Sequence, residues 1–299
     1  MRECSTALDP VRRARSGWGR PASSGGGWIR RDVSLASVVA SAVCYSTLAV
    51  LTRLAYQQGM RPLPLLAWRF ALVAVLLFAV QAARSPRSLA VEARTVARFG
   101  VLAVAGYGFG SVCFFYALKS APASVVAVLL YAYPAIVTLL GWANGGARPG
   151  RARWVALSAT FAGCALVSGV FGSGAVSPVG VALSLCAAAG YAVFTHLSHR
   201  WMGPHPRAVL MAYVFAFSAA LALAACAASG ESLSPAGWSS SAWLLLGAIV
   251  VVPTAAAVLL FLEGIHGLGA SQAAVVSTLE PVFTIALAAG VLGERLGLV

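Results

Sequence analysis

Charged residues are scarce in this sequence of 299 residues, and acidic residues are the scarcest. Charged side chains make up 10% of the chain, with 8 Asp and Glu against 21 Lys and Arg, whereas hydrophobic residues make up 60%. A soluble domain carries about a quarter charged residues, so this composition excludes an ordinary water-soluble fold. The net charge of +13 does not indicate nucleic-acid binding, because the arginines lie between apolar runs and not on one basic face.

Several patterns typical of metal sites and enzymes are also missing. The six cysteines show no CxxC spacing, and five lie inside apolar runs, where cysteine behaves as a small hydrophobe. His196 and His199 are three residues apart, but no third or fourth zinc ligand accompanies them. Gly106, Gly108 and Gly110 lack the spacing of a nucleotide-binding loop; Gly106 and Gly110 instead form the small-residue pattern that lets membrane helices approach closely. We therefore expect no cofactor, no metal site and no enzymatic activity.

Long apolar runs fill most of the chain. Nine of them approach the roughly 20 residues that a bilayer-spanning helix requires, and their short connections leave no room for a soluble domain. The expected spans are 33–56, 63–83, 97–118, 122–143, 151–171, 177–200, 207–227, 240–262 and 269–292. Residues 1–32 are rich in Arg, Gly and Ser and lack the apolar segment of a secretory signal. We interpret them as a disordered cytoplasmic tail.

Basic residues are divided unevenly among the connections between these spans. With the amino terminus in the cytoplasm, sixteen arginines lie on the inner side and four basic residues on the outer side. Cytoplasmic loops carry the excess of Lys and Arg in membrane proteins. The sequence therefore predicts a multi-pass protein of the plasma membrane with a cytoplasmic amino terminus.

Two stretches of the sequence, 124–148 and 271–295, resemble each other at an offset of 147 residues. They agree at Ser124/Ser271, Ala127/Ala274, Val128/Val275, Pro134/Pro281, Leu140/Leu287, Gly146/Gly293 and Arg148/Arg295. The prolines Pro134 and Pro281 lie near the middle of each stretch, where each removes an amide donor and breaks the helix. Broken apolar helices at matching places in two halves indicate the central site of a transporter.

The same offset predicts two repeats of five helices, over residues 33–173 and 174–299. Because each repeat holds an odd number of helices, the second is expected to run upside down relative to the first. Adding 147 to the fifth span places a tenth span at 298–318, beyond Val299. We expect nine spans to be present and the tenth to be missing through truncation; a genuine nine-span protein is the alternative. The expected fold is an all-α integral membrane protein with an inverted 5+5 repeat.

Polar side chains near Pro281 are candidates for a substrate path. Ser277, Glu280 and Thr284 recur at helical spacing and form one polar stripe. A carboxylate within the membrane is costly unless it faces a cavity, pairs with another group or is protonated. Glu280 therefore binds a cationic substrate or a proton, or else it holds the broken backbone around Pro281. The stripe itself lines a cavity or serves as a contact between helices.

Aromatic side chains and one arginine complete the set of candidates. The aromatic candidates are Tyr116, Tyr131 and Tyr133. Tyr133 matches Glu280 by repeat position and is its expected partner. Arg69 lies in the second span beside Trp68. It pairs with Glu280 or attracts an anion, or else it snorkels to the interface together with Trp68.

Several short motifs accompany these features. They are Trp68-Arg69-Phe70, Tyr116-Ala117-Leu118, Tyr133-Pro134, Leu279-Glu280-Pro281-Val282 and Leu292-Gly293-Glu294-Arg295-Leu296. On these motifs, residues 33–299 resemble an EamA-type member of the drug/metabolite transporter superfamily. The resemblance implies two inverted five-helix bundles around a central cavity, cytoplasmic termini, and movement of small metabolites, amino acids or drugs, frequently outward. The sequence departs from the family pattern in the absent tenth helix, at Ala147 in place of a common Glu, and at Glu263, which matches Tyr116.

The leading hypothesis is a secondary transporter that exports a small organic solute by alternating access. The two repeats would rock about Pro134 and Pro281, and the partners would be the solute and the lipid bilayer, with a homodimer left open. The alternative is a polytopic membrane enzyme or a non-transporting membrane interaction protein. A polar track that reaches both faces favours transport, whereas a localised cluster near one face favours an enzyme.

Overall fold

The computed structural model describes residues 26–145, 177–201 and 205–293, together with a few residues between 148 and 162 and Gly203. Most of the predicted fifth span, most of the amino-terminal tail, Ala147 and the Glu294-Arg295 motif lie outside these residues. Within the described residues the fold is helical throughout, without strands. This is expected of apolar segments in a bilayer, because a helix satisfies its backbone hydrogen bonds internally.

The helical elements of the described residues follow in chain order. They are α1 (Gly26–Gln57), α2 (Pro62–Arg84), η2 (Pro86–Leu89), α3 (Ala93–Val101), η3 (Leu102–Tyr107), α4 (Gly108–Ser120), α5 (Ala123–Leu130), α6 (Tyr133–Ala143), α8 (Pro178–Trp201), α9 (Arg207–Ser229), α10 (Ser240–Val250), η4 (Val251–Ala256), α11 (Ala257–Leu268), α12 (Ala270–Val276), η5 (Ser277–Leu279) and α13 (Glu280–Leu292).

Eight helical segments in the described part of the chain are long and apolar enough to cross a membrane. They are Asp32–Gln57, Pro62–Arg84, Ala93–Ser120, Ala123–Ala143, Pro178–Ser198, Arg207–Ser229, Ser240–Leu268 and Gln272–Leu292. Each coincides with one of the predicted spans, so eight of the nine are confirmed. Large apolar side chains such as Val75, Leu244 and Val282 are exposed on the outside of the bundle, as is expected where a helix faces lipid.

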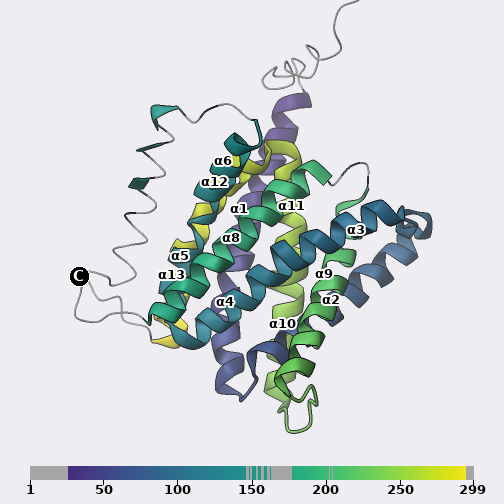
Figure 1. Cartoon of the computed structure of the whole chain (residues 1–299), viewed down its shortest axis with the longest axis vertical. Coiled ribbons are helices and arrows are strands. Elements are labelled where there is room, and N and C mark those ends of the chain that lie inside the picture. Colours follow the sequence, from purple (N-terminus) through teal and green to yellow (C-terminus); the bar gives the residue numbers. More distant parts are fainter. Residues whose placement is uncertain are drawn as a thin grey trace, which may run out of the picture.

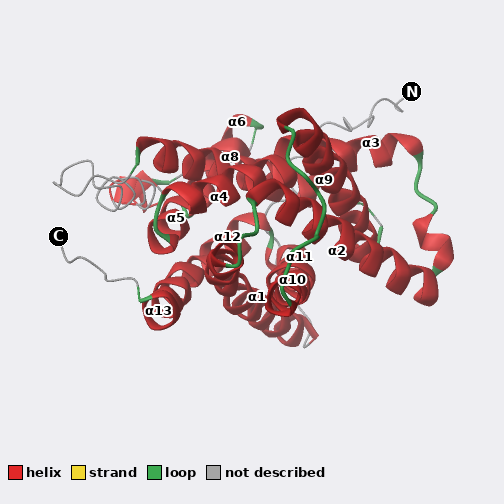
Figure 2. Cartoon of the chain, turned by 90° about the horizontal axis from the view of Figure 1, so that it is seen from below, coloured by secondary structure: helices red, strands yellow, loops and turns green. Residues whose placement is uncertain are grey.

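The two halves of the chain are interleaved and do not form separate bundles. In Figure 1, α5, α6, α8, α12 and α13 gather on one side and α2, α3 and α9 on the other, with α1 and α11 between them. The view from below in Figure 2 shows the same arrangement, with α13 and α1 along one edge. Each large contact joins a helix of the first half to a helix of the second, such as α2 with α9 and α4 with α8.

The contacts between the two halves recur when each element is replaced by its counterpart in the other half. At the offset of 147 residues, α1 corresponds to α8, and α3 through α4 correspond to α10 through α11. α1 packs on η4 and α11, and α8 packs in the same way on η3 and α4. Contacts that recur when the halves are exchanged are what an approximate two-fold axis between them produces.

Close approach between α4 and α8 depends on glycine. A Cβ atom at Gly190 would lie 2.8 Å from the Cα atom of Gly110, and one at Gly110 would lie 3.1 Å from the carbonyl oxygen of Ala187. No side chain fits between these backbones. The small-residue pattern in the third span is thereby confirmed as a helix-packing motif, here between the first half and the second.

The third span and its counterpart in the second half each contain a π-helical turn, which the sequence analysis did not anticipate. η3 covers Leu102–Tyr107, and adding 147 gives 249–254, which overlaps η4 at Val251–Ala256. In η4 the cause is visible, because Pro253 has no amide to bond the carbonyl of Ile249 four residues earlier. Single π turns inside helices occur frequently at functional sites.

Candidate functional site

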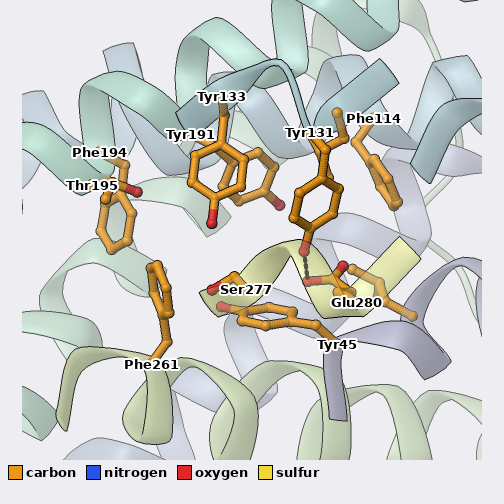
Figure 3. A pocket seen from close by; sticks show the side chains of 12 residues that line it. Tyr45, Phe114, Tyr131, Tyr133, Tyr191, Phe194, Thr195, Phe261, Ser277 and Glu280 are labelled. Carbon is orange, nitrogen blue, oxygen red and sulfur yellow. Dashed lines mark hydrogen bonds between the residues drawn. The ribbon is translucent and has the colours of Figure 1, made fainter. Parts of the chain in front are cut away.

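A cavity of about 50 Å³ lies where the two halves meet (Figure 3). Its walls are mainly aromatic, with four tyrosines, three phenylalanines and a single charged side chain. The lining residues are Tyr45, Leu48, Phe114, Leu130, Tyr131, Tyr133, Tyr191, Phe194, Thr195, Phe261, Ser277 and Glu280. Four of these, Tyr131, Tyr133, Ser277 and Glu280, are among the candidates that the sequence proposed.

The broken helices place these four side chains. α5 ends at Leu130, and α6 begins at Tyr133 with Pro134 in its first turn. In the second half α12 ends at Val276, a 3₁₀ turn covers Ser277–Leu279, and α13 begins at Glu280 with Pro281 in its first turn. Both predicted breaks are confirmed. Proline is well accommodated at the start of a helix, so a new helix begins at each proline. The polar side chains next to the two breaks line the cavity between the halves.

A hydrogen bond joins the two breaks directly. The hydroxyl of Tyr131 donates to Oε2 of Glu280 at 2.5 Å (Figure 3). The Glu280 side chain is half-buried and faces the cavity. Of the two interpretations of Glu280, the structure therefore records a bond to the opposite half and not to the backbone around Pro281. A carboxyl in this position can accept a proton or attract a cation.

Eight of the twelve lining residues form four repeat-related pairs. At the offset of 147, Leu48 corresponds to Thr195, Phe114 to Phe261, Leu130 to Ser277 and Tyr133 to Glu280. Both members of every pair line the same cavity. The cavity therefore lies on the approximate two-fold axis. The offset of 147 residues pointed to Tyr133 and Glu280 as partners; the same offset also relates Phe114 to Phe261 and Leu48 to Thr195, which were not predicted.

Aromatic side chains that no motif pointed to make up much of the wall. Tyr45 in α1 and Tyr191 and Phe194 in α8 all face the cavity (Figure 3). In an apolar sequence an aromatic residue in a helix is usually a packing residue, so composition alone could not single them out. Tyr45 packs edge-on against Phe261 at 6.4 Å between ring centroids.

Three of the sequence candidates do not line this cavity. Thr284 is buried and its hydroxyl lies 3.5 Å from the carbonyl oxygen of Ser46 in α1, a contact between helices. Tyr116 is half-buried near the end of α4. Arg69 is fully buried behind the cavity wall. The contact of Thr284 agrees with the interpretation of the polar stripe as a contact between helices.

Two of the three interpretations of Arg69, snorkelling and pairing with Glu280, are corrected, and the attraction of an anion stays a prediction. Its guanidinium does not snorkel, because the whole side chain is buried and bonds to Thr254 and Tyr107. It does not pair with Glu280 either, since the ion pair found among the described residues joins Arg207 and Glu263. Its neighbour Trp68 donates to the carbonyl of Leu233 at 3.1 Å. Neighbouring residues on a helix point about 100° apart, so the two side chains reach different surroundings.

Comparison with known proteins agrees with this architecture. The family model of the EamA-like transporter family matches residues 33–169 and 178–299. "Uncharacterized transporter YwfM" of Bacillus subtilis (strain 168) is 31% identical over 192 residues, which are 61% of this chain and 61% of that protein. "Uncharacterized transporter YcbK" of the same organism is 30% identical over 272 residues, 86% of this chain and 84% of that protein.

A solved crystal structure shares the fold, with a TM-score of 0.64 at 21% identity over 88% of this chain and 90% of the other. At that identity the likeness shows the arrangement of helices alone. The family match extends over both halves of the chain, and both halves contribute residues to the cavity. The chain is a multi-pass membrane protein that belongs to the EamA-like transporter family, within the drug/metabolite transporter superfamily.

Proposed function

We propose that this protein is a secondary transporter that exports a small organic solute across the plasma membrane by alternating access. The observation that carries the proposal is the position of the cavity. It is lined by repeat-related pairs from both halves, and its carboxyl is bound across the axis by Tyr131. A site shared equally by two inverted repeats can be presented to either face by tilting one repeat against the other.

The lining indicates the chemical class of the solute. Seven aromatic rings surround one carboxyl, Glu280, with the hydroxyls of Thr195 and Ser277 as further polar groups. Aromatic faces attract cations, and a single carboxylate supplies one fixed negative charge. The matching solute has an apolar or aromatic body and one cationic or hydrogen-donating group.

Transport requires that the cavity change size. A volume of about 50 Å³ holds a few water molecules, given that each needs roughly 10–15 Å³, whereas pockets for drug-sized ligands measure about 300–1,000 Å³. The breaks at Pro134 and Pro281 are the places where the backbone can bend, since the hydrogen-bond ladder is already interrupted there. Bending at these points widens the cavity toward one face.

The orientation of the chain follows from the distribution of charge, and the direction of transport from the family resemblance. The excess of arginine in alternate connections supports a cytoplasmic amino terminus in the plasma membrane. Outward transport is the direction that the resemblance to EamA-type transporters implies. Proton antiport is a natural coupling, with Glu280 as the group that alternates between a proton and the solute.

An export assay in cells lacking their own efflux pumps tests the proposal. Cells expressing the chain, or Glu280→Gln at a matched level, are loaded with radiolabelled benzyltrimethylammonium and, separately, with neutral neopentylbenzene. The wild type should lower the accumulation of the cation and leave that of its neutral isostere unchanged, and Glu280→Gln should not lower either. If each compound accumulates to the same level in cells with and without the protein in their membrane, the proposal is contradicted. Export of the neutral compound, unaffected by Glu280→Gln, would leave transport standing but overturn the cationic assignment.

A further inference from the structure

Arg69 in α2 is a fully buried cation without an acidic partner. It is 0% exposed, and the ion pair recorded in the described part of the chain involves other residues. Burying a charge is costly unless hydrogen bonds or other charges compensate for it. The contacts of its guanidinium therefore show what keeps an arginine in the middle of a membrane protein.

Its two hydrogen bonds go to equivalent places in the two halves. Nε donates to Oγ1 of Thr254 at 2.7 Å, and Nη2 donates to the hydroxyl of Tyr107 at 3.2 Å. Tyr107 and Thr254 are separated by 147 residues, the offset of the repeat. They lie in the two π turns, Tyr107 at the end of η3 and Thr254 within η4. One guanidinium thus connects the irregular turns of the third span and its counterpart.

The position equivalent to Arg69 in the second half is Ala216. No second guanidinium can be supplied from there, so the bridge exists once and serves both halves. The Cζ atom of Arg69 also lies 5.2 Å from the ring centroids of Phe70 and Phe115. Aromatic faces attract a cation at such distances, which stabilises the charge without neutralising it.

The hydrogen bond from Arg69 to Thr254 is one of two linked hydrogen bonds beside Pro253. Because Pro253 lacks an amide, the carbonyl of Ile249 is left without its helical partner. The Thr254 hydroxyl donates to that carbonyl at 2.6 Å, and its oxygen accepts the bond from Arg69. The π turn is thereby fixed in place, and it leads directly into α11, which carries Phe261 on the cavity wall.

The bond to Tyr107 leads to the opposite wall. The Tyr107 ring contacts Tyr191 at 5.5 Å and 83° and Phe194 at 5.3 Å and 67° between ring planes. Both of these residues are on α8 and face the cavity (Figure 3). Tyr107 also interacts with the side chain of Tyr45, a further lining residue. Moving the Tyr107 ring would move this wall.

We infer that Arg69 is a positioning residue of the cavity: it touches no solute, and it sets the separation of the α8 wall and the Phe261 wall by holding the two π turns together. The planar guanidinium of an arginine holds donors on separate nitrogens, here Nε and Nη2, in a fixed geometry that the single nitrogen of a lysine ammonium does not reproduce. The inference concerns the same cavity as the proposed function, but its geometry does not depend on which solute is carried.

A reporter that needs no solute tests this inference. Thr195 lines the cavity next to Phe194 and is 1% exposed. In Thr195→Cys, the rate of modification by a small neutral methanethiosulfonate, followed on the corresponding peptide by mass spectrometry, reports how open the cavity is. Arg69→Met, which keeps an unbranched apolar stem but is two atoms shorter and has no donors, should raise that rate about tenfold, the equivalent of one lost hydrogen bond. Arg69→Lys should raise it similarly.

Arg53→Met is the matched control. Arg53 in α1 is also partly buried and donates to the carbonyl of Ala121, but neither residue lines the cavity. This substitution should lower the unfolding temperature and leave the modification rate of Cys at position 195 unchanged. An unchanged rate in Arg69→Met, or an equal rise in Arg53→Met, would overturn the inference.

Single hydroxyl deletions keep the test valid if Arg69→Met does not fold. Tyr107→Phe and Thr254→Val each remove one acceptor of the guanidinium, together with the interaction of Tyr107 with Tyr45 and the bond of Thr254 to Ile249, respectively. Each should raise the modification rate, and in an Arg69→Lys background each should raise it by a smaller factor. Full additivity of the two deletions with Arg69→Lys would show that they act independently of Arg69. Because no solute is used, failure of the export assay leaves this result interpretable.

Discussion

Tyr131 and Glu280, 149 residues apart in the sequence, share a 2.5 Å hydrogen bond that closes the interface between the two broken helices. Each comes from a proline-interrupted stretch of a different half. The bond satisfies a carboxyl that would otherwise face an aromatic cavity alone. It also joins the two helix breaks, so we expect its loss to affect stability and, under the proposed function, transport.

Removal of the Tyr131 hydroxyl should weaken this link measurably. A typical hydrogen bond contributes about 0.5–1.5 kcal/mol net, and Tyr131→Phe deletes the donor while keeping the ring. We expect the free energy of unfolding in detergent to fall by about that amount. A double-mutant cycle with Glu280→Gln isolates the pair, and a coupling energy near zero would contradict the direct interaction.

Transport of a cation should depend on pH through Glu280. At low pH the carboxyl is protonated and neutral, so it no longer attracts a cation, and the rate should fall as the pH falls. Glu280→Gln has no titratable group at this position and should show a flat profile at the background flux measured without the protein. The measurement is the initial flux of benzyltrimethylammonium in proteoliposomes over a pH series. A profile of unchanged shape in Glu280→Gln would remove the carboxyl from the coupling mechanism.

The glycine contact between α4 and α8 should not tolerate a methyl group. Gly190→Ala places a Cβ atom 2.8 Å from Gly110, and overpacking a tight interface costs about 1–3 kcal/mol. We expect a lower unfolding temperature and lower expression. Gly247→Ala in α10 is the matched control, because a Cβ atom there meets nothing within 4 Å. Equal stability of the two variants would show that the helices do not approach so closely.

The ion pair of Arg207 and Glu263 should contribute little to stability. The two side chains are 26% and 41% exposed, and partly solvated pairs are worth about 0–1 kcal/mol. Glu263→Gln should therefore change the free energy of unfolding by less than about 1 kcal/mol and leave export intact. Thermal unfolding at low and high salt measures the effect. A larger loss would assign this pair a structural importance that its exposure does not suggest.

Opposite labelling of equivalent positions tests the inverted topology. Ser85 and Ser232 are 147 residues apart and both are exposed in connections between helices. In single-site variants of a cysteine-free chain, Ser232→Cys should react with a membrane-impermeant maleimide from outside intact cells. Ser85→Cys should react only after the membrane is opened. Labelling of both from the same side would rule out inversion, and with it the mechanism of alternating access proposed above.

Much of the fold is predictable because the membrane restricts the choices. Apolar runs of bilayer length must form helices there, so eight of the predicted spans coincide with helices of the structure. Both helix breaks were predicted from Pro134 and Pro281, since proline cannot donate the missing bond wherever the chain places it. The fifth predicted span lies mostly outside the described residues and stays a prediction.

The site was predicted only in part. Tyr131, Tyr133, Ser277 and Glu280 lie next to the breaks and line the cavity. Thr284 shares the helical face of Glu280 but packs against α1, because a stripe of side chains along one helix meets different neighbours at different heights. Tyr45, Tyr191 and Phe194 were missed, since an aromatic residue within an apolar run has no pattern that distinguishes a wall from a core.

The sequence by itself determined which segments are helices, where two of them break and that one half repeats the other, because local backbone chemistry and the demand for internal hydrogen bonds act along the chain. Only the tertiary structure decided that the repeat-related positions converge on one cavity and that Arg69 turns inward to Tyr107 and Thr254. Those outcomes depend on how helices far apart in sequence pack and cross, and side-chain spacing along a single helix does not contain that information.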